Sequence, residues 1–114
     1  MRVDAYLGRI RYDGPTALTP ETLRRIHRAH MVAVPFENLD IHLGIPIGLS
    51  VPAFYEKIVD RRRGGFCYEL NGLFAWLLTE LGWSVTILSA RVASPGRLSP
   101  EFDHLLLLID GAGP

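Results

Sequence analysis

One segment of the chain, RRRGGFCYELNGLF at residues 61–74, carries the residues best suited to covalent chemistry. Cys67 is the only cysteine, and it follows Gly64 and Gly65 at the expected start of a helix. The N–H groups of a helix N-terminus favour anions, so a thiol at this place is favoured as the nucleophilic thiolate. The two glycines have no side chains to keep a substrate from the sulfur. The alternative, that Cys67 is a small buried hydrophobic residue, stays open.

The histidines are the candidate partners of this thiol, because a thiolate nucleophile needs an imidazole within hydrogen-bond reach and a third group that orients it. His104 begins the apolar run HLLLLID, which is expected to form a strand, and a rigid strand suits a catalytic base. His27 and His30 lie on an arginine-rich segment, where a surface or helix-packing role is the better interpretation, and His42 fits either role. A cysteine at a helix start followed by a histidine on a strand is the layout of papain-like thiol enzymes.

Other kinds of site have weaker support. His27 and His30 are three residues apart and could chelate a metal, but no third ligand joins them at a metal-binding spacing, so no metal cofactor is expected. The sequence has no phosphate-binding or dinucleotide-binding glycine motif. Arg61, Arg62 and Arg63 could attract a phosphate or a coenzyme, although a solvated helix end explains the first two equally well.

Composition excludes several function classes. The 114 residues include 12 Lys+Arg and 12 Asp+Glu, so the chain is not expected to bind nucleic acid or a membrane surface through bulk charge. Hydrophobic residues make up 48%, which suits one globular core, and no apolar run is long enough to span a bilayer. A single cysteine cannot form an internal disulfide, and no secretory signal is recognised, so the expected location is the cytoplasm.

The first part of the chain predicts helices that would carry this chemistry. Thr19 is a suitable N-cap with Pro20 at the first helical position, Ser50 is another N-cap, and Gly82 is a suitable C-terminal stop. The predicted helices cover residues 4–11, 20–34, 51–63 and about 67–81, with a turn at 13–15 and loop or short extended structure at 36–49.

After Gly82 the hydrophobic period changes from 3.6 to 2, which indicates strands. The predicted strands cover residues 83–92 and 104–110, and the second is apolar enough to be buried on both faces. A loop is expected at 93–101, and the final GAGP reads as a turn. The predicted class is therefore α+β, with helices followed by the first strands of a sheet.

Four segments in this order and spacing resemble the arylamine N-acetyltransferase family: YLGRIRYDGP, PFENLDIHLG, RGGFCYELNGLF and DHLLLLI. The resemblance implies an N-terminal helical domain at residues 1–83 and the first strands of an antiparallel β-barrel at 84–114. It also implies that Cys67 is the acetyl-accepting nucleophile and His104 its imidazole partner. Phe36 matches an aromatic residue of the acceptor pocket, and Arg9, Glu37 and Arg63 match a charged network that supports the site.

The implied reaction is ping-pong transfer of acetyl from acetyl-CoA, through a thioester on the cysteine, to a small arylamine or arylhydrazine. Members of the family are more than twice as long, and their triad ends with an aspartate on the next strand, in a segment resembling DVGFG. Asp103 adjoins His104 and Asp110 lies at the far end of that strand, so neither matches it. We therefore expect a fragment that lacks much of the coenzyme A site and is inactive by itself.

Two further expectations follow from this departure. A strand with an open edge pairs readily with a second copy, so self-association is expected. A non-catalytic folding or interaction module made from a truncated acetyltransferase is the alternative to an enzyme. Another papain-like thiol enzyme, such as a relative of the transglutaminases, fits PFENL and the R-G-G-x-C-x-E-x-N motif less well.

Overall fold

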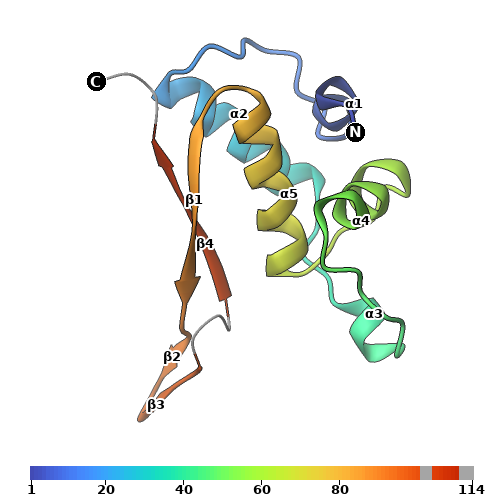
Figure 1. Ribbon diagram of the computed structural model, residues 1–114, viewed down its shortest axis with the longest axis vertical. Helices are drawn as coiled ribbons and strands as arrows, with labels where there is room; N and C mark the ends of the chain where they lie inside the picture. The colour runs from blue at the N-terminus through green and yellow to red at the C-terminus, as the bar shows by residue number, and fades with distance from the viewer. Residues whose placement is uncertain (101–103, 111–114) are drawn as a thin grey trace.

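The computed structural model describes residues 1–100 and 104–110. Helices come first in the chain and antiparallel strands follow, as the sequence predicts (Figure 1). The helices are α1 (Val3–Arg9), α2 (Pro20–Ala33), α3 (Leu39–His42), α4 (Val51–Tyr55), the π-helix η1 (Glu56–Asp60) and α5 (Cys67–Glu80). The strands are β1 (Ser84–Ala90), β2 (Ala93–Ser94), β3 (Arg97–Leu98) and β4 (His104–Asp110).

The helix boundaries follow from local capping. Thr19 Oγ1 accepts the N–H of Thr22 at 3.1 Å at the start of α2, and Ser50 Oγ accepts the N–H of Ala53 at 3.3 Å at the start of α4. Gly82 has a φ of 109° beyond the end of α5, where its N–H and that of Trp83 bond the carbonyls of the last turn. These bonds form a Schellman motif, so the predicted stop at Gly82 is confirmed.

Helix α5 forms the centre of the hydrophobic core and lies between α4 and the β1–β4 ribbon (Figure 1). Its side chains Leu73, Leu77 and Leu78 are fully buried, and Tyr6 of α1 and Ile26 of α2 are buried with them. Burial of each such leucine contributes roughly 1.5–3 kcal/mol to folding. The helix that begins with Cys67 is therefore anchored in the core by several buried side chains.

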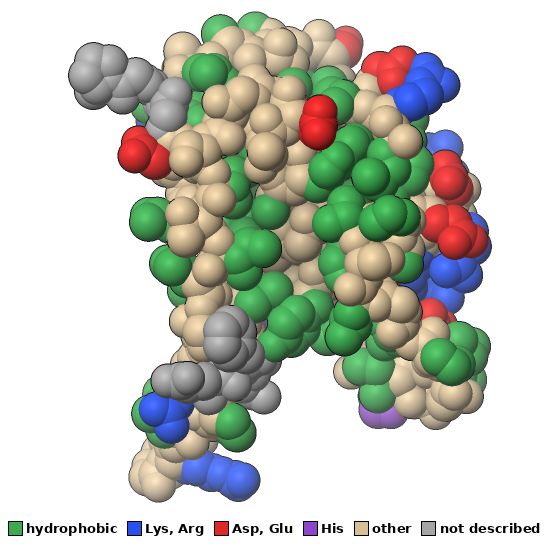
Figure 2. All heavy atoms as spheres, viewed as in Figure 1, with side chains coloured by type: hydrophobic (Ala, Val, Ile, Leu, Met, Phe, Trp, Pro, Cys, Tyr) green, Lys and Arg blue, Asp and Glu red, His purple; other side chains and the backbone are tan. Residues whose placement is uncertain are grey.

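Strands β1 and β4 pair antiparallel over their whole length, from Ser84 opposite Asp110 to Ala90 opposite His104. Leu105 is buried, but Leu106 and Leu108 are about half exposed. The expectation that both faces of this strand are buried is wrong for the described residues, because the second face has no covering layer among them. Figure 2 shows hydrophobic side chains gathered between this ribbon and the helices.

Three short elements depart from the sequence prediction. The helix predicted over 51–63 ends at Asp60 and changes to π-helical winding after Tyr55. The predicted loop 36–49 contains α3, whose first N–H, on Leu39, is bonded at 3.1 Å by Glu37 Oε2. The predicted loop 93–101 contains the β2–β3 hairpin, which turns at Gly96 with a φ of 69°. Elements this short have no hydrophobic period to reveal them.

Candidate active site

Cys67 is the first residue of α5 and is 8% exposed. The residue before it, Phe66, donates its N–H to Glu69 Oε1 at 3.2 Å, which is one half of a capping box. The start of α5 is therefore fixed by its own third residue. Cys67 belongs to the first turn of α5, where unpaired helix N–H groups favour a negative charge.

The loop before Cys67 is paired with the segment that follows α2. Gly65 N–H bonds the Pro35 carbonyl at 3.3 Å, and Glu37 N–H bonds the Gly65 carbonyl at 2.9 Å, so Phe36 and Gly65 form a parallel β-bridge. A Cβ on Gly64 would lie 1.9 Å from the Pro35 carbonyl oxygen. Glycine at 64 is thus required by the close approach of two backbones.

This bridge holds the backbone of Phe36 against Gly65, two residues before Cys67, and the Phe36 side chain is 64% exposed. A large exposed aromatic ring on a backbone fixed by hydrogen bonds is suited to contact an apolar ligand. The two sequence segments PFENL and RGGFC, which are far apart in the chain, therefore form one continuous structure around the thiol.

A cluster of five charged side chains adjoins this bridge through Glu37, and we call it the lysine cluster. Lys57 of η1 is 3% exposed, and its Nζ lies 2.9 Å from Glu69 Oε2, 3.3 Å from Asp40 Oδ2 and 3.5 Å from Glu37 Oε1. Arg63 completes the cluster, with Nη1 at 2.8 Å from Asp40 Oδ1 and Nη2 at 3.2 Å from Glu37 Oε1. Three carboxylates thus surround two cations, and each carboxylate contacts at least one of them.

The cluster favours the charged forms of Asp40, Lys57 and Arg63. The hydrogen bond from Arg63 holds the pKa of Asp40 below its usual range, with a smaller contribution from Lys57 and against the effect of burial. Burial acts to lower the pKa of Lys57, but the carboxylates of Glu69 and Asp40 outweigh it and raise that pKa. A hydrogen bond to Asp40 likewise raises the pKa of Arg63. Charges paired in this way hold α3, η1 and the start of α5 in one arrangement.

Arg9 supports the same region through the backbone. Its Nε donates to the Ile58 carbonyl at 2.7 Å and its Nη1 to the Ala33 carbonyl at 3.0 Å. Its Nη2 lies 3.3 Å from the carbonyls of Arg62 and Arg63. Of the three residues expected to form a charged network, Arg63 and Glu37 pair directly, and Arg9 contacts main-chain carbonyls near them.

His104 is the first residue of β4 and is half-buried. The start of this strand is tied to α5, because Asn71 Nδ2 donates to the Leu105 carbonyl at 2.8 Å, and Asn71 lies one turn after Cys67. Among the described residues, no hydrogen bond joins Cys67 to His104, and none joins a carboxylate to His104. Asp103 lies outside the described residues, and Asp110 lies at the opposite end of β4.

Comparison with known proteins decides the family. A family model described as N-acetyltransferase matches residues 19–114. The chain belongs to the arylamine N-acetyltransferase family. An arylamine N-acetyltransferase of Mycolicibacterium smegmatis is 52% identical over 93 residues, 81% of this chain, and the pineal gland isozyme of Gallus gallus is 45% identical over 96% of it. The chain spans 34% and 39% of the lengths of these two relatives.

Solved structures of arylamine N-acetyltransferases have the same fold over this chain. The Mycobacterium marinum enzyme superimposes with a TM-score of 0.91 at 44% identity, over 99% of this chain and 43% of its own. A second structure of the same enzyme, in complex with CoA, gives a TM-score of 0.90 over 98% of this chain and 42% of its own. The predicted α+β class is confirmed, and the strands described here do not close into a barrel.

The family resemblance did not single out three residues whose contacts hold the surroundings of Cys67. Lys57 is the only lysine of the chain. Its neighbours on the same helical segment, Phe54 and Ile58, are buried, and its place among such apolar residues is the one sequence feature that points to it. Asp40 lies in the segment expected to be a loop. Asn71 belongs to the R-G-G-x-C-x-E-x-N motif, but its contact lies 34 residues away and has no local sequence signal.

The other histidines are structural or exposed. His30 is 3% exposed, its Nδ1 lies 2.8 Å from the Tyr6 hydroxyl, and its ring packs on Phe74. His27 and His42 are exposed. In residues 1–100 and 104–110 no group of three or more His, Cys, Asp or Glu side chains is arranged to hold a metal ion. Within the same residues, no helix is both long and apolar enough to cross a bilayer.

Proposed function

We propose that the protein containing this chain transfers an acetyl group from acetyl-CoA to small arylamines or arylhydrazines through a thioester on Cys67. The observation that carries this proposal is the position of Cys67 at the start of α5, tied through Asn71 to the strand that begins with His104. Membership of the arylamine N-acetyltransferase family supports the same reaction.

The reaction has two half-steps. His104 takes the proton of the Cys67 thiol, the thiolate attacks the acetyl carbonyl, and the coenzyme A thiol leaves with a proton from the imidazolium. The amine nitrogen then attacks the thioester carbonyl, the Cys67 thiolate leaves, and the imidazole removes the surplus proton of the amine. The helix N-terminus stabilises the thiolate in both half-steps.

We assign Phe36 to the acceptor site, as a wall for the ring of the amine. Its exposure beside the bridge to Gly65 supports this role. Arg9, Glu37 and Arg63 are positioning residues that hold the loop before Cys67, through the carbonyl contacts and the lysine cluster described above. None of them needs to contact the substrate.

Four further features of the protein are also proposals. The division into a helical domain at 1–83 and a barrel region from 84 onward follows the change from helices to strands. The cytoplasm suits a catalytic thiol, because reducing conditions keep it from forming disulfides. Residues 1–114 by themselves are proposed to be inactive and to self-associate along β4, supported by the half-exposed Leu106 and Leu108.

The test of the acetyl transfer is intact mass spectrometry of the protein that contains this chain, not of residues 1–114 alone, after incubation with acetyl-CoA, followed by peptide mapping. We expect one acetyl group on Cys67, discharged by an added arylamine and absent in Cys67→Ser. His104→Gln should slow acetylation by roughly 10⁴, comparable to the loss of an orienting or accepting group in a triad. Acetylation elsewhere, or none, would contradict the proposal and favour a non-catalytic module. Light scattering showing only monomeric 1–114 at high concentration would contradict the self-association.

A further inference from the structure

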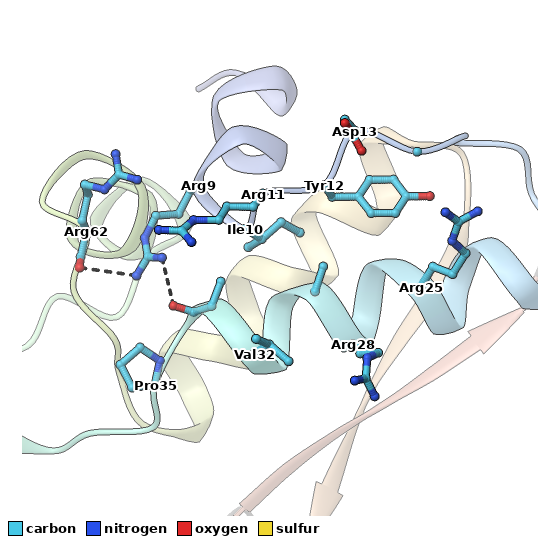
Figure 3. Close-up of a pocket in the computed structure, with 13 residues that line it drawn as sticks. Arg9, Ile10, Arg11, Tyr12, Asp13, Arg25, Arg28, Val32, Pro35 and Arg62 are labelled. Carbon is cyan, nitrogen blue, oxygen red and sulfur yellow. Dashed lines mark hydrogen bonds between the residues drawn. The ribbon is translucent and has the colours of Figure 1, made fainter.

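A hollow lies between the residues that follow α1 and one face of α2. Its volume is about 820 Å³. The lining side chains come from the end of α1 with the turn after it, from α2, from Pro35 just beyond α2, and from the loop after η1 (Figure 3). Cys67, His104 and Phe36 do not line this hollow, so it is separate from the site described above.

The hollow is lined by far more positive than negative charge, and we call it the arginine pocket. Its five arginines are Arg9, Arg11, Arg25, Arg28 and Arg62, and its single carboxylate is Asp13. Within the described part of the chain, only Arg9 of these five has its guanidinium engaged, with main-chain carbonyls. The other four have no ion pair there, so their positive charge is not compensated inside the protein.

The backbone also brings two of these arginines into the pocket. Arg11 and Arg62 have φ angles of 57° and 55°, and they are the only non-glycine residues with positive φ in the described ranges. Such a conformation is unfavourable for residues with a Cβ and is found at functional sites more often than elsewhere. Burial lowers the pKa of the Arg9 guanidinium, and the positive charges of Arg62 and Arg11 lower it further.

Neighbouring arginines are divided between the two sites. Arg63 points its guanidinium at Asp40 and Glu37 in the lysine cluster, whereas Arg62 lines the arginine pocket. On α2, Arg24 is exposed and does not line the pocket, whereas Arg25 does. Arg24 therefore offers a control of the same charge, length and helix.

We propose that the arginine pocket binds a small anion that carries at least two phosphate groups. Guanidinium groups pair with phosphate through two parallel hydrogen bonds, and they are more weakly hydrated than ammonium groups. Four uncompensated guanidiniums spread around one hollow match a diphosphate better than a single phosphate. The volume is in the range of pockets for small molecules, and the concave shape and zero net charge of the chain disfavour a long nucleic acid. The proposal does not depend on acetyl transfer.

The test is isothermal titration of the protein, carrying Cys67→Ser so that no acetyl chemistry intervenes, with inorganic pyrophosphate, ADP and adenosine. We expect saturable binding of pyrophosphate and ADP that weakens with salt, and no binding of adenosine. Arg25→Gln and Arg28→Gln should each lower the affinity for pyrophosphate roughly tenfold, as expected for the loss of a charged hydrogen bond. Arg24→Gln should leave the affinity unchanged. Equal affinities for pyrophosphate and ADP would indicate a site that recognises the diphosphate alone. Tighter binding of ADP than of pyrophosphate would indicate a site for a nucleotide.

Three results would overturn the proposal. The first is no saturable binding of either diphosphate, and the second is an equal effect of Arg24→Gln and Arg25→Gln. The third is tighter binding of a single-stranded RNA, lost in Arg25→Gln, which would make the surface a nucleic-acid site. Circular dichroism melts of each variant confirm that the fold is intact, since all three substituted arginines are exposed.

Discussion

Asn71 Nδ2 lies 2.8 Å from the carbonyl oxygen of Leu105, so one side-chain hydrogen bond joins the helix of Cys67 to the strand of His104. The donor lies one turn after the thiol and the acceptor one residue after the imidazole. The distance between the Cys67 thiol and the His104 imidazole therefore depends on the Asn71–Leu105 hydrogen bond, in which neither of these two residues takes part.

Asn71→Ala should reduce the rate of Cys67 acetylation by roughly 10- to 100-fold, because misplacement by about 1 Å can cost that much. The loss of one hydrogen bond should lower the free energy of unfolding by about 1 kcal/mol. The readout that separates positioning from stability is the pH profile of acetylation, which should change in Asn71→Ala. Asn38→Ala, at an exposed position with no side-chain cap bond, is the control and should change neither quantity.

Gly64→Ala should lower the free energy of unfolding by roughly 1–3 kcal/mol or more, because the added Cβ would lie 1.9 Å from a backbone oxygen that cannot rotate away. Gly8→Ala is the matched control in α1, where a Cβ meets nothing within 4 Å. It should raise the free energy of unfolding by roughly 0.5–1 kcal/mol through helix propensity. Urea denaturation of the two variants measures both, and an unchanged midpoint in Gly64→Ala would refute the close approach.

Lys57→Met should destabilise the protein by roughly 3–5 kcal/mol, because it leaves the buried Glu69 and Asp40 without their shared cation. Adding Glu69→Gln should recover part of the loss, since the amide oxygen can still accept the Phe66 N–H. Arg61→Met removes a cation from an exposed pair at 3.8 Å and should change stability by less than about 0.5 kcal/mol. Chemical denaturation provides the comparison, and equal effects of Lys57→Met and Arg61→Met would count against the cluster.

His30 should make stability pH-dependent in a defined window. Burial, followed by the charge of His27, lowers the pKa of His30 from 6.5 to about 4. The unfolded chain then binds one more proton than the folded protein between these values, so stability falls as the pH falls from about 6.5 to about 4. The slope is about 1.4 kcal/mol per pH unit, or about 3 kcal/mol in all. Asp40, whose pKa is lowered, adds its own loss only below about pH 4.

The measurement is denaturation at several pH values for the unchanged protein, His30→Gln and His27→Gln. His30→Gln should flatten the dependence between pH 6.5 and 4, while a glutamine can still bond the Tyr6 hydroxyl. His27→Gln should keep most of the slope, because His27 is exposed. A slope that survives unchanged in His30→Gln would show that another group is responsible.

Sequence alone predicted the features that depend on neighbours within a few residues. The caps at Thr19 and Ser50 and the stop at Gly82 are of this kind, and so is the position of Cys67 at a helix start. The family motifs then indicated which thiol and which imidazole to pair. The roles of Cys67 and His104 remain predictions until the acetylation experiment is done.

Contacts between residues far apart in the chain could not be predicted from local sequence patterns. The partners of Lys57 lie on α3, on α5 and in the loop before α3, and no local pattern brings them together. The bridge between Phe36 and Gly65 depends on how α2 packs, which periodicity does not specify. The change to π-helical winding at Glu56–Asp60 likewise follows from tertiary contacts rather than from intrinsic propensity.

The contacts of Arg9 have a consequence for how the molecule opens. One guanidinium holds the last carbonyl of α2, at Ala33, a carbonyl of η1, at Ile58, and the two carbonyls before Gly64. If any one of these three segments opens, the Arg9 side chain loses a contact through which it restrains the other two. Amide hydrogens at the end of α2, in η1 and in the loop before Cys67 should therefore exchange with solvent as one cooperative unit, with a shared opening free energy.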